Sequence, residues 1–156
     1  IILEGAQAGL SWITILKKRE NYRRLFEGFD PAKVAAFDDD DVARLMGDAG
    51  IIRNQAKIRS AINNANAFIE HFGDDEDAFA AFLWGFVDGE PIVNQRKTMA
   101  DIVAITDAST EMSKALKKIG FSFIGPTTCY AMMQAAGMVD DHPISCFRHT
   151  SNRRGP

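Results

Sequence analysis

Glu4 and Trp12 have the side-chain types and the spacing that suit the binding of a flat polar ring. Apolar residues recur at helical intervals from Leu3 to Lys18, which predicts one continuous helix. Residues eight apart on a helix lie about 80° apart around its axis, so both side chains would border one pocket. Aromatic surfaces and polar groups are what hold a nucleobase outside its stack. The alternative interpretation is a tryptophan in the core and a glutamate in solvent.

Residues 114–137 predict two helices joined by a tight hairpin that binds phosphate. Gly120 can adopt the left-handed conformation that ends a helix, and Gly125 with Pro126 begins the next one. The N–H groups at the start of that second helix attract an anion. The side chains that add hydroxyl donors and positive charge are Thr127, Thr128, Lys114, Lys117 and Lys118. No acidic residue occurs in this segment, so the hairpin predicts a nucleic acid as partner, and the alternative is an ordinary helical pair.

The hairpin, the residues that follow it to position 142, and the separate blocks 2–22 and 48–58 resemble bacterial 3-methyladenine DNA glycosylase I, of the helix-hairpin-helix DNA glycosylase superfamily. The resemblance implies an all-α, compact helical domain that contains a helix-hairpin-helix DNA-binding motif. It places this domain at residues 1–146 and leaves 147–156 as a mobile C-terminal tail. It also implies that an N-terminal segment is missing, which in the family supplies two zinc ligands and aromatic residues of the base pocket.

The same resemblance assigns roles to residues of the predicted first helix. Trp12 would stack on the extruded base, and Glu4 would be the catalytic and base-binding carboxylate that accepts hydrogen bonds from its edge. Gln7 and Gly9 would contact DNA, and Leu10 would be an apolar wedge in the gap left by the flipped nucleotide. The alternative for this stretch is that its small residues merely permit close helix packing. The hairpin residues expected at DNA are Lys117, Lys118, Gly120, Gly125, Thr127 and Thr128.

His142 and Cys146 form a His-x3-Cys pair whose imidazole and thiolate suit tetrahedral zinc. A structural site needs four ligands, and the resemblance takes the other two from the missing segment; His149 is a possible substitute. Zinc would then be structural and weakly bound or absent in this chain. Asp140 lies where many helix-hairpin-helix glycosylases have a catalytic aspartate, but the 3-methyladenine family usually shows an uncharged residue there. A chemical role for Asp140 therefore stays open.

The resemblance implies a monofunctional glycosylase that flips 3-methyladenine out of alkylated double-stranded DNA, hydrolyses its N-glycosidic bond and releases the free base. Adenine methylated at N3 is cationic and already a good leaving group, so stacking and a carboxylate suffice without a strong general acid. Two alternatives remain. One is a catalytically inactive DNA-damage binding module, and the other is a structural helical domain that binds no DNA.

Composition limits these possibilities without deciding between them. The chain has 156 residues, 46% of them hydrophobic, and a net charge of −3, which describes one domain with a real core. Its basic residues cluster at 17–24 and in the hairpin, apart from acidic runs at 38–41 and 74–77, so a local basic surface for DNA is compatible with the net charge. Two cysteines make no disulfide framework and no segment is apolar enough to span a membrane, which together predict a cytoplasmic protein, by default a monomer.

Several elements must position these residues. Besides the first helix, the periodicity and the capping residues predict helices at 30–36, 39–46, 54–72 and 76–87. The helix at 54–72 is the longest, and its apolar positions give it a simple role in the core. Residues 88–91 predict a turn, and 92–108 a loop with at most a short helix. Ser109 or Thr110 is expected to cap the helix that enters the hairpin.

Overall fold

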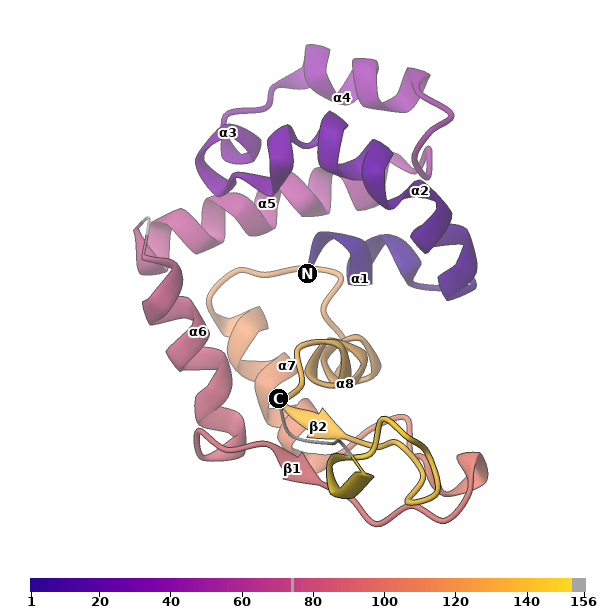
Figure 1. Ribbon diagram of the computed structural model, residues 1–156. Coiled ribbons are helices and arrows are strands. Elements are labelled where there is room, and N and C mark those ends of the chain that lie inside the picture. The colour runs from indigo at the N-terminus through magenta and orange to yellow at the C-terminus, as the bar shows by residue number, and fades with distance from the viewer. Residues whose placement is uncertain (74, 153–156) are drawn as a thin grey trace.

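The computed structural model describes residues 1–73 and 75–152, and this part of the chain is mainly helical, which confirms the all-α class (Figure 1). The α-helices are α1 (Ile2–Gln7), α2 (Trp12–Leu25), α3 (Pro31–Ala35), α4 (Asp39–Gly47), α5 (Gln55–Phe72), α6 (Glu76–Trp84), α7 (Asp107–Lys118) and α8 (Pro126–Ala135). Short 3₁₀ turns occupy Glu27–Phe29, Gly85–Val87, Met99–Asp101 and Thr150–Asn152. No helix of the described residues has the length and apolar character needed to cross a bilayer.

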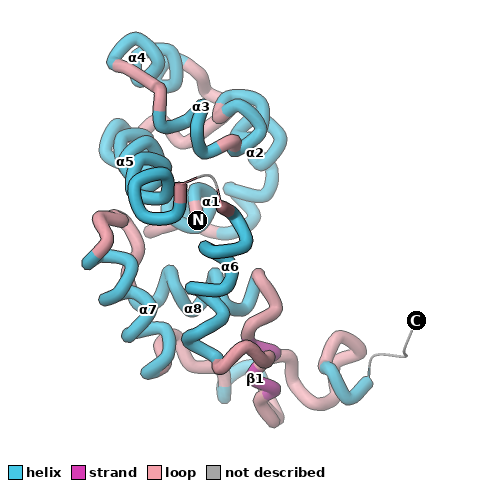
Figure 2. Tube along the Cα trace, turned by 90° about the vertical axis from the view of Figure 1, so that its left-hand side faces the viewer, coloured by secondary structure: helices cyan, strands magenta, loops and turns pink. Residues whose placement is uncertain are grey.

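The buried apolar side chains of the described residues form two clusters that meet along α5. One cluster is built by α1 to α4 with the first half of α5, and the other by the end of α5 with α6, α7 and α8. In Figures 1 and 2 helices α3 and α4 lie above α5, whereas α6, α7 and α8 lie below it. Helix α5 packs against α1, α3, α4 and α6, so it is the element that connects both halves of the molecule.

The expected helix from Leu3 to Lys18 is wrong, because the chain turns between α1 and α2. Gly9 has a φ of +78°, a left-handed conformation that helix interiors do not contain. Ser11 adopts extended backbone and is the N-cap of α2. A glycine followed two residues later by a serine is the sequence signature of one helix ending and another beginning. Glu4 and Trp12 therefore lie on different helices, and the 80° argument does not apply to them.

The other predicted helices are confirmed, with differences at their ends. Asp30, Asp38 and Asn54 accept backbone hydrogen bonds at the starts of α3, α4 and α5, as their residue types indicate. Helix α7 begins earlier than expected, because Thr106 is its N-cap and Ser109 is the third helical residue of a capping box. The expected cap at Ser109 or Thr110 is therefore wrong.

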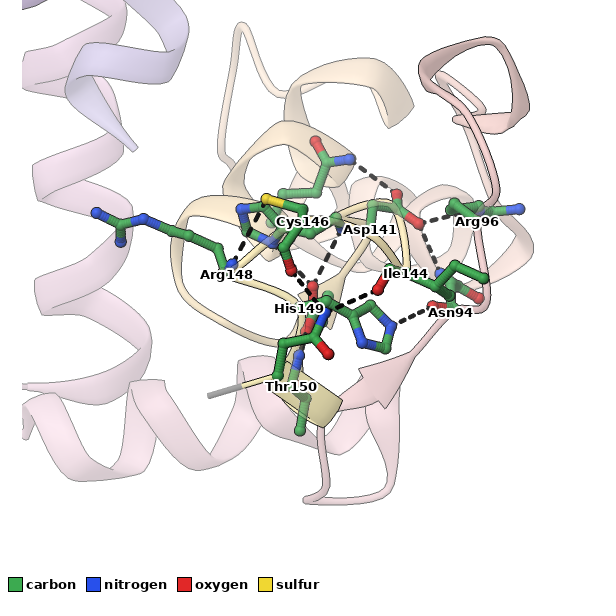
Figure 3. A network of polar contacts seen from close by, with 12 residues as sticks. Asn94, Arg96, Asp141, Ile144, Cys146, Arg148, His149 and Thr150 are labelled. Atoms are coloured by element: carbon green, nitrogen blue, oxygen red, sulfur yellow. Dashed lines mark hydrogen bonds and ion pairs between the residues drawn. The ribbon is translucent and has the colours of Figure 1, made fainter. Parts of the chain in front are cut away.

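Two short strands join the loop after α6 to the segment after α8. β1 (Ile92–Val93) and β2 (Val139–Asp140) pair in parallel, with Ile92 opposite Val139. Strands of two residues give no recognisable alternation, so the sequence did not predict them. Beyond β2 the chain stays attached: the His149 side chain is fully buried and its Nε2 lies 3.0 Å from the carbonyl oxygen of Asn94 (Figure 3). His149, Thr150 and Asn152 of the expected mobile tail are thus hydrogen-bonded to the domain, and its last residues, 153–156, lie outside the described part.

Candidate active site and DNA-binding surface

Glu4 is a buried carboxylate with an oxygen that no group of the described residues satisfies. It lies in the first turn of α1, its residue is only 5% exposed, and Oε2 has no hydrogen-bond partner among the described residues. Burial disfavours the charged form and raises the pKa of Glu4 to about 7. A solvated glutamate, the alternative drawn from the sequence, is excluded by this burial. A buried and unpartnered acceptor costs free energy, which a ligand carrying N–H donors would recover.

Trp12 is the first residue of α2 and is half-buried. It packs at the edge of the cluster that contains Ala6 and Ile15, so part of its ring belongs to the core. Neither Glu4 nor Trp12 lines the two described cavities. The larger, about 440 Å³, is open and lies between the start of α4 and α5, and the smaller, about 10 Å³, lies beneath α1. The pairing of Glu4 and Trp12 around one base therefore stays a prediction.

The turn between α1 and α2 presents Leu10 on a fixed backbone. The side chain of Gln7 donates from Nε2 to the carbonyl oxygen of Leu10 at 2.6 Å, and the Leu10 N–H returns to the Gln7 carbonyl at 2.7 Å. Lys57 donates to the carbonyl oxygens of Ala6 and Ala8 at 2.9 and 2.6 Å. The Leu10 residue is 37% exposed, and a Cβ placed on Gly9 would meet open space. An exposed leucine on a braced turn has the geometry that a wedge requires.

The hairpin between α7 and α8 has the backbone that its glycines predict. Gly120 has a φ of +94°, its N–H donates to the Lys117 carbonyl, and the next N–H, of Phe121, donates to the Leu116 carbonyl. This pair of bonds is a Schellman motif, which closes a helix in the left-handed region. Gly125 is the N-cap of α8.

Several donors at the start of α8 are left without partners in the described part of the protein. The N–H groups of Gly125, Thr127 and Thr128 have no partner within the described residues, and neither do the hydroxyls of the two threonines. Lys117 and Lys118 lie exposed in the last turn of α7 and make no ion pair with the described residues. Free amide donors at a helix N-terminus beside unpaired lysines form an anion site suited to a phosphate.

The basic residues of α2 contribute less positive potential than the sequence indicated. Arg19 and Arg23 both approach Glu20, and Arg24 pairs with Asp48. The ammonium of Lys18 donates to the carbonyl oxygen of Ala49 at 2.5 Å. These partners engage Lys18 and the three arginines. At the hairpin, Lys114 pairs with Glu111, whereas Lys117 and Lys118 make no ion pair with the described residues.

The hairpin loop is fastened to α5 by side chains that the sequence analysis treated only as part of a core helix. Asn64 accepts from the Ser122 N–H at 2.8 Å and donates to the Ser122 carbonyl at 3.0 Å. Ser60 donates to the same carbonyl, and Asn63 donates to the carbonyl of Gly120. A signal was available, because polar residues at 57, 60 and 64 recur at intervals of three and four beside the apolar positions 58, 61 and 65.

His142 and Cys146 have surroundings compatible with metal ligands. Nδ1 of His142 lies 2.8 Å from Oδ1 of Asp140, which leaves Nε2 available, and the thiol sulfur of Cys146 accepts a weak bond from the Arg148 N–H at 3.5 Å. A carboxylate that hydrogen-bonds one ring nitrogen usually orients an imidazole whose other nitrogen binds zinc. Among the described residues, however, no three His, Cys, Asp or Glu side chains gather around one point. These donors alone do not complete a zinc site.

His149 does not substitute for a missing ligand. Its Nδ1 accepts from the Ser151 N–H at 3.2 Å, and its Nε2 is therefore the protonated nitrogen that donates to the Asn94 carbonyl. Nε2 holds the C-terminal segment against the loop after β1, and Nδ1 is engaged by the backbone of the same segment (Figure 3). The expectation that His149 could complete the coordination sphere is therefore wrong.

Asp140 is fully engaged in structure. It accepts from the backbone N–H and hydroxyl of Thr150 at 2.6 and 2.5 Å, and from the backbone and ring of His142. Burial alone would raise the pKa of Asp140, but these hydrogen bonds lower it well below its ordinary value. A carboxylate so occupied cannot activate water without breaking these bonds, so a structural role is favoured over a chemical one.

Asp141 is the centre of a second network. Its carboxylate accepts from the hydroxyl of Tyr130, from Gln134, from Asn94 and from Arg96 (Figure 3). Burial raises its pKa, and these donors more than reverse the effect. The network ties α8 to the loop after β1, so Asp141 has a structural role.

Comparison with known proteins decides the family. The sequence model of the methyladenine glycosylase family matches residues 1–149. The chain belongs to the methyladenine glycosylase family. It is 52% identical over 153 residues to DNA-3-methyladenine glycosylase 1 of Escherichia coli (strain K12), a match that covers 98% of this chain and 81% of that protein. The family membership confirms the resemblance inferred from the separated sequence blocks.

Solved structures of family members agree with the fold. A crystal structure of 3-methyladenine DNA glycosylase I superposes with a TM-score of 0.91 at 51% identity, covering 95% of this chain and 81% of that one. A variant of 3-methyladenine DNA glycosylase I in complex with 3-methyladenine superposes with a TM-score of 0.89 at 36% identity, covering 99% and 81%. The family fold thus spans nearly the whole of this chain.

Proposed function

We propose that this protein is a DNA repair glycosylase that hydrolyses the N-glycosidic bond of 3-methyladenine in alkylated double-stranded DNA. Family membership supports the activity, and the relatives named for 3-methyladenine support the substrate. The structural observation that carries the proposal is the buried Glu4 carboxylate with an unpartnered oxygen. We further propose that the protein acts as a monomer and releases the free base as product.

Glu4 is suited to select a methylated base through its charge. With a pKa of about 7, the free protein holds this carboxylate in both protonation states near neutral pH. A cationic base brought next to it stabilises the charged form and lowers its pKa, so binding and ionisation favour each other. Trp12 would stack on the base, and the attraction of an aromatic face for a cation adds about 1 kcal/mol. An unmethylated base lacks the charge and gains neither interaction fully.

The chemistry then needs little from a general acid. The cationic base is a good leaving group, so the glycosidic bond breaks as the base departs, with its electron pair going to the base. Water adds to C1′ of the sugar and loses a proton, which leaves an abasic site. The contribution of Glu4 is to stabilise the bound base through hydrogen bonds that strengthen in a water-excluded site.

The hairpin and the turn would act on the DNA itself. The free N–H groups and hydroxyls at the start of α8, with Lys117 and Lys118, bind a phosphate of the backbone. Leu10, presented by the turn after Gly9, enters the base stack and offsets part of the cost of flipping. Gln7 supports this turn through its bond to the Leu10 carbonyl.

Zinc is a separate and purely structural part of the proposal. His142 and Cys146 would supply two of four ligands, with Asp140 orienting the imidazole. Two further ligands must come from outside the described residues, and no step of the reaction passes through the metal. Measuring bound zinc by mass spectrometry before and after His142→Ala tests this point independently of activity. Equal zinc content in both proteins would disprove the assignment.

The activity is tested by incubating the protein with duplex DNA treated with a methylating agent. Chromatography should detect free 3-methyladenine, and alkali should cleave the DNA at the abasic sites left behind. Glu4→Gln should release the base more slowly than the unchanged protein. Glu70→Gln, which removes an exposed carboxylate from α5, is the matched control and should retain full activity. Binding to DNA without release of any base would favour the inactive binding module instead.

A further inference from the structure

One face of α5 carries polar side chains that hold backbone atoms outside the helix. Lys57, Ser60 and Asn64 follow each other at intervals of three and four residues, so they lie in one row along the helix. Lys57 stands at the N-terminal end of the row and donates to the carbonyl oxygens of Ala6 and Ala8 at 2.9 and 2.6 Å. It therefore clamps the end of α1 and the start of the turn that carries Leu10.

The other end of the row clamps the hairpin. Asn64 pairs with both backbone groups of Ser122, accepting from its N–H and donating to its carbonyl. Ser60 donates to that carbonyl at 3.3 Å and accepts from the Ser122 hydroxyl at 3.1 Å. The carboxamide of Asn64 carries both a donor and an acceptor, so no apolar side chain, ammonium or ionised carboxylate reproduces its two bonds to Ser122.

These hydrogen bonds fix the positions of the turn after α1 and of the hairpin loop more strictly than apolar packing would. Ser60 and Asn64 are each 7% exposed, and burial lowers the pKa of Lys57. Polar groups removed from water are costly unless their partners lie at the correct distance and angle. Apolar side chains tolerate sliding, whereas this row is satisfied by one arrangement of its partners. The row therefore fixes the turn and the hairpin loop on one rigid helix.

The two clamped segments also touch each other. A Cβ built on Gly5 of α1 would lie 3.8 Å from Cβ of Phe123 at the tip of the hairpin loop. In Figure 1 the loop between α7 and α8 accordingly passes beside the start of α1. Phe123 has a φ of +54° and is 43% exposed, so the loop holds a strained backbone next to the helix that bears Glu4. The pocket residue, the wedge and the phosphate site thus share one support.

We propose that the row Lys57, Ser60 and Asn64 is a positioning element. It sets the distance between the phosphate site at the start of α8 and the turn that carries Leu10. DNA held at α8 would then present its damaged nucleotide to Leu10 and Glu4 in register. The inference rests on the proposed glycosylase function and adds residues to it that touch neither base nor phosphate. Lys57 in particular acts through Ala6 and Ala8, because its ammonium is already occupied by their carbonyls.

Lys57→Met tests one end of the row, with Lys97→Met as the control that removes an equal charge from an exposed loop. Single-turnover excision from methylated duplex should slow about 10- to 100-fold in Lys57→Met, the range expected for a small misplacement far from the chemistry. The fluorescence of 2-aminopurine beside an abasic analogue, which reports unstacking, should fall. The salt dependence of duplex affinity should stay unchanged. Lys57→Arg keeps donors for both carbonyls and should recover part of the rate.

Asn64→Ala tests the other end, and the double variant tests the coupling. Lys57 and Asn64 are proposed to fix the same distance, so once one contact is lost the other has less effect. The double variant Lys57→Met/Asn64→Ala should therefore lose less activity than the product of the two single losses. Thermal melts ensure that rates are compared for folded protein. If Asn64→Ala does not fold, Ser60→Ala, which deletes one hydroxyl from the same contact, replaces it in the cycle.

Three results would overturn the inference. Lys57→Met could excise at the rate of Lys97→Met, or its salt dependence could weaken by about 0.9 in logarithmic slope, which would make Lys57 a direct phosphate contact. The single losses could also multiply, which would show two independent local effects. If the unchanged protein itself released no 3-methyladenine, the proposed function would fail, whereas normal release with unaffected variants would reject the positioning row alone.

Discussion

Glu4→Gln should make the protein more stable and at the same time a poorer binder of 3-methyladenine. The pKa of Glu4 lies at about 7 in the folded protein, against an ordinary value of 4.5. A raised pKa means that the folded state binds the proton more tightly, so the protein loses stability as pH rises from about 4.5 to about 7. The gap between the two values corresponds to about 3 kcal/mol. Glutamine removes the titration, and its stabilising effect should grow from about 1 kcal/mol at pH 5 to about 3 kcal/mol at pH 8.

Thermal melts at the two pH values measure this effect. For a chain of this length, about 3 kcal/mol corresponds to a rise in Tm of roughly 6 to 12 °C at pH 8. Binding of the free base, followed by Trp fluorescence, should weaken about ten- to a hundredfold, since a hydrogen bond to a charged group contributes about 1.5 to 3 kcal/mol. Glu70→Gln should change neither quantity appreciably. If Glu4→Gln were no more stable than the unchanged protein at pH 8, the burial of an unpaired carboxylate would be refuted.

Further predictions concern pH, DNA contacts and structure. The kcat/KM for excision should rise with pH to a plateau above about 7, as free Glu4 ionises, and a flat profile would remove Glu4 from the reaction. Lys117→Gln and Lys118→Gln should each lower the salt dependence of duplex affinity by about 0.9 in logarithmic slope, measured by fluorescence anisotropy. Leu10→Ala should reduce 2-aminopurine unstacking but leave binding of the free base unchanged, and a parallel loss of both would contradict the wedge. Asp140→Asn should lower the free energy of unfolding at neutral pH by about 2 kcal/mol, with the difference fading in acid as the depressed pKa of Asp140 is approached. Excision per folded molecule should persist in that variant, and its loss would assign Asp140 to the chemistry.

The hairpin is the part of the molecule that the sequence predicted best. Its signals are local: Gly120 for a positive φ, Gly125 and Pro126 for the start of α8, and lysines in a segment, 114–137, that contains no acidic residue. Each of these depends on backbone conformation within a few residues, which a sequence records directly. The family resemblance rested on long sequence blocks, and the match of the family model to residues 1–149 confirms it.

The first helix was mispredicted because its apolar period continues across the turn. Ile2, Ala6, Leu10 and Ile13 follow each other at intervals of three and four residues, so periodicity alone did not detect the break. The left-handed Gly9 and the N-cap Ser11 carried the opposite signal, and local backbone preference prevailed over the pattern of burial. This error matters for function, since the break is what presents Leu10.

Contacts between distant segments could not be predicted at all. Asn64 meets Ser122 across 58 positions, and Lys57 meets Ala6 across 51. Nothing in the spacing along the chain encodes such pairs, and α5 was therefore interpreted as a core helix only. The hydrogen bonds to the ring of His149 and to the carboxylate of Asp140 are further examples, because several of the partners come together only in the folded chain.

The most direct test of the central claim is an NMR titration of the Glu4 side-chain carboxyl carbon, assigned by its loss in Glu4→Gln. In the free protein this carbon should titrate with a pKa of about 7. Addition of 3-methyladenine should shift its resonance and change its titration, because the base supplies the hydrogen-bond donors that Oε2 lacks. A carboxyl that titrates near 4.5 and does not respond to the base would contradict the assignment of Glu4 as the base-recognising group.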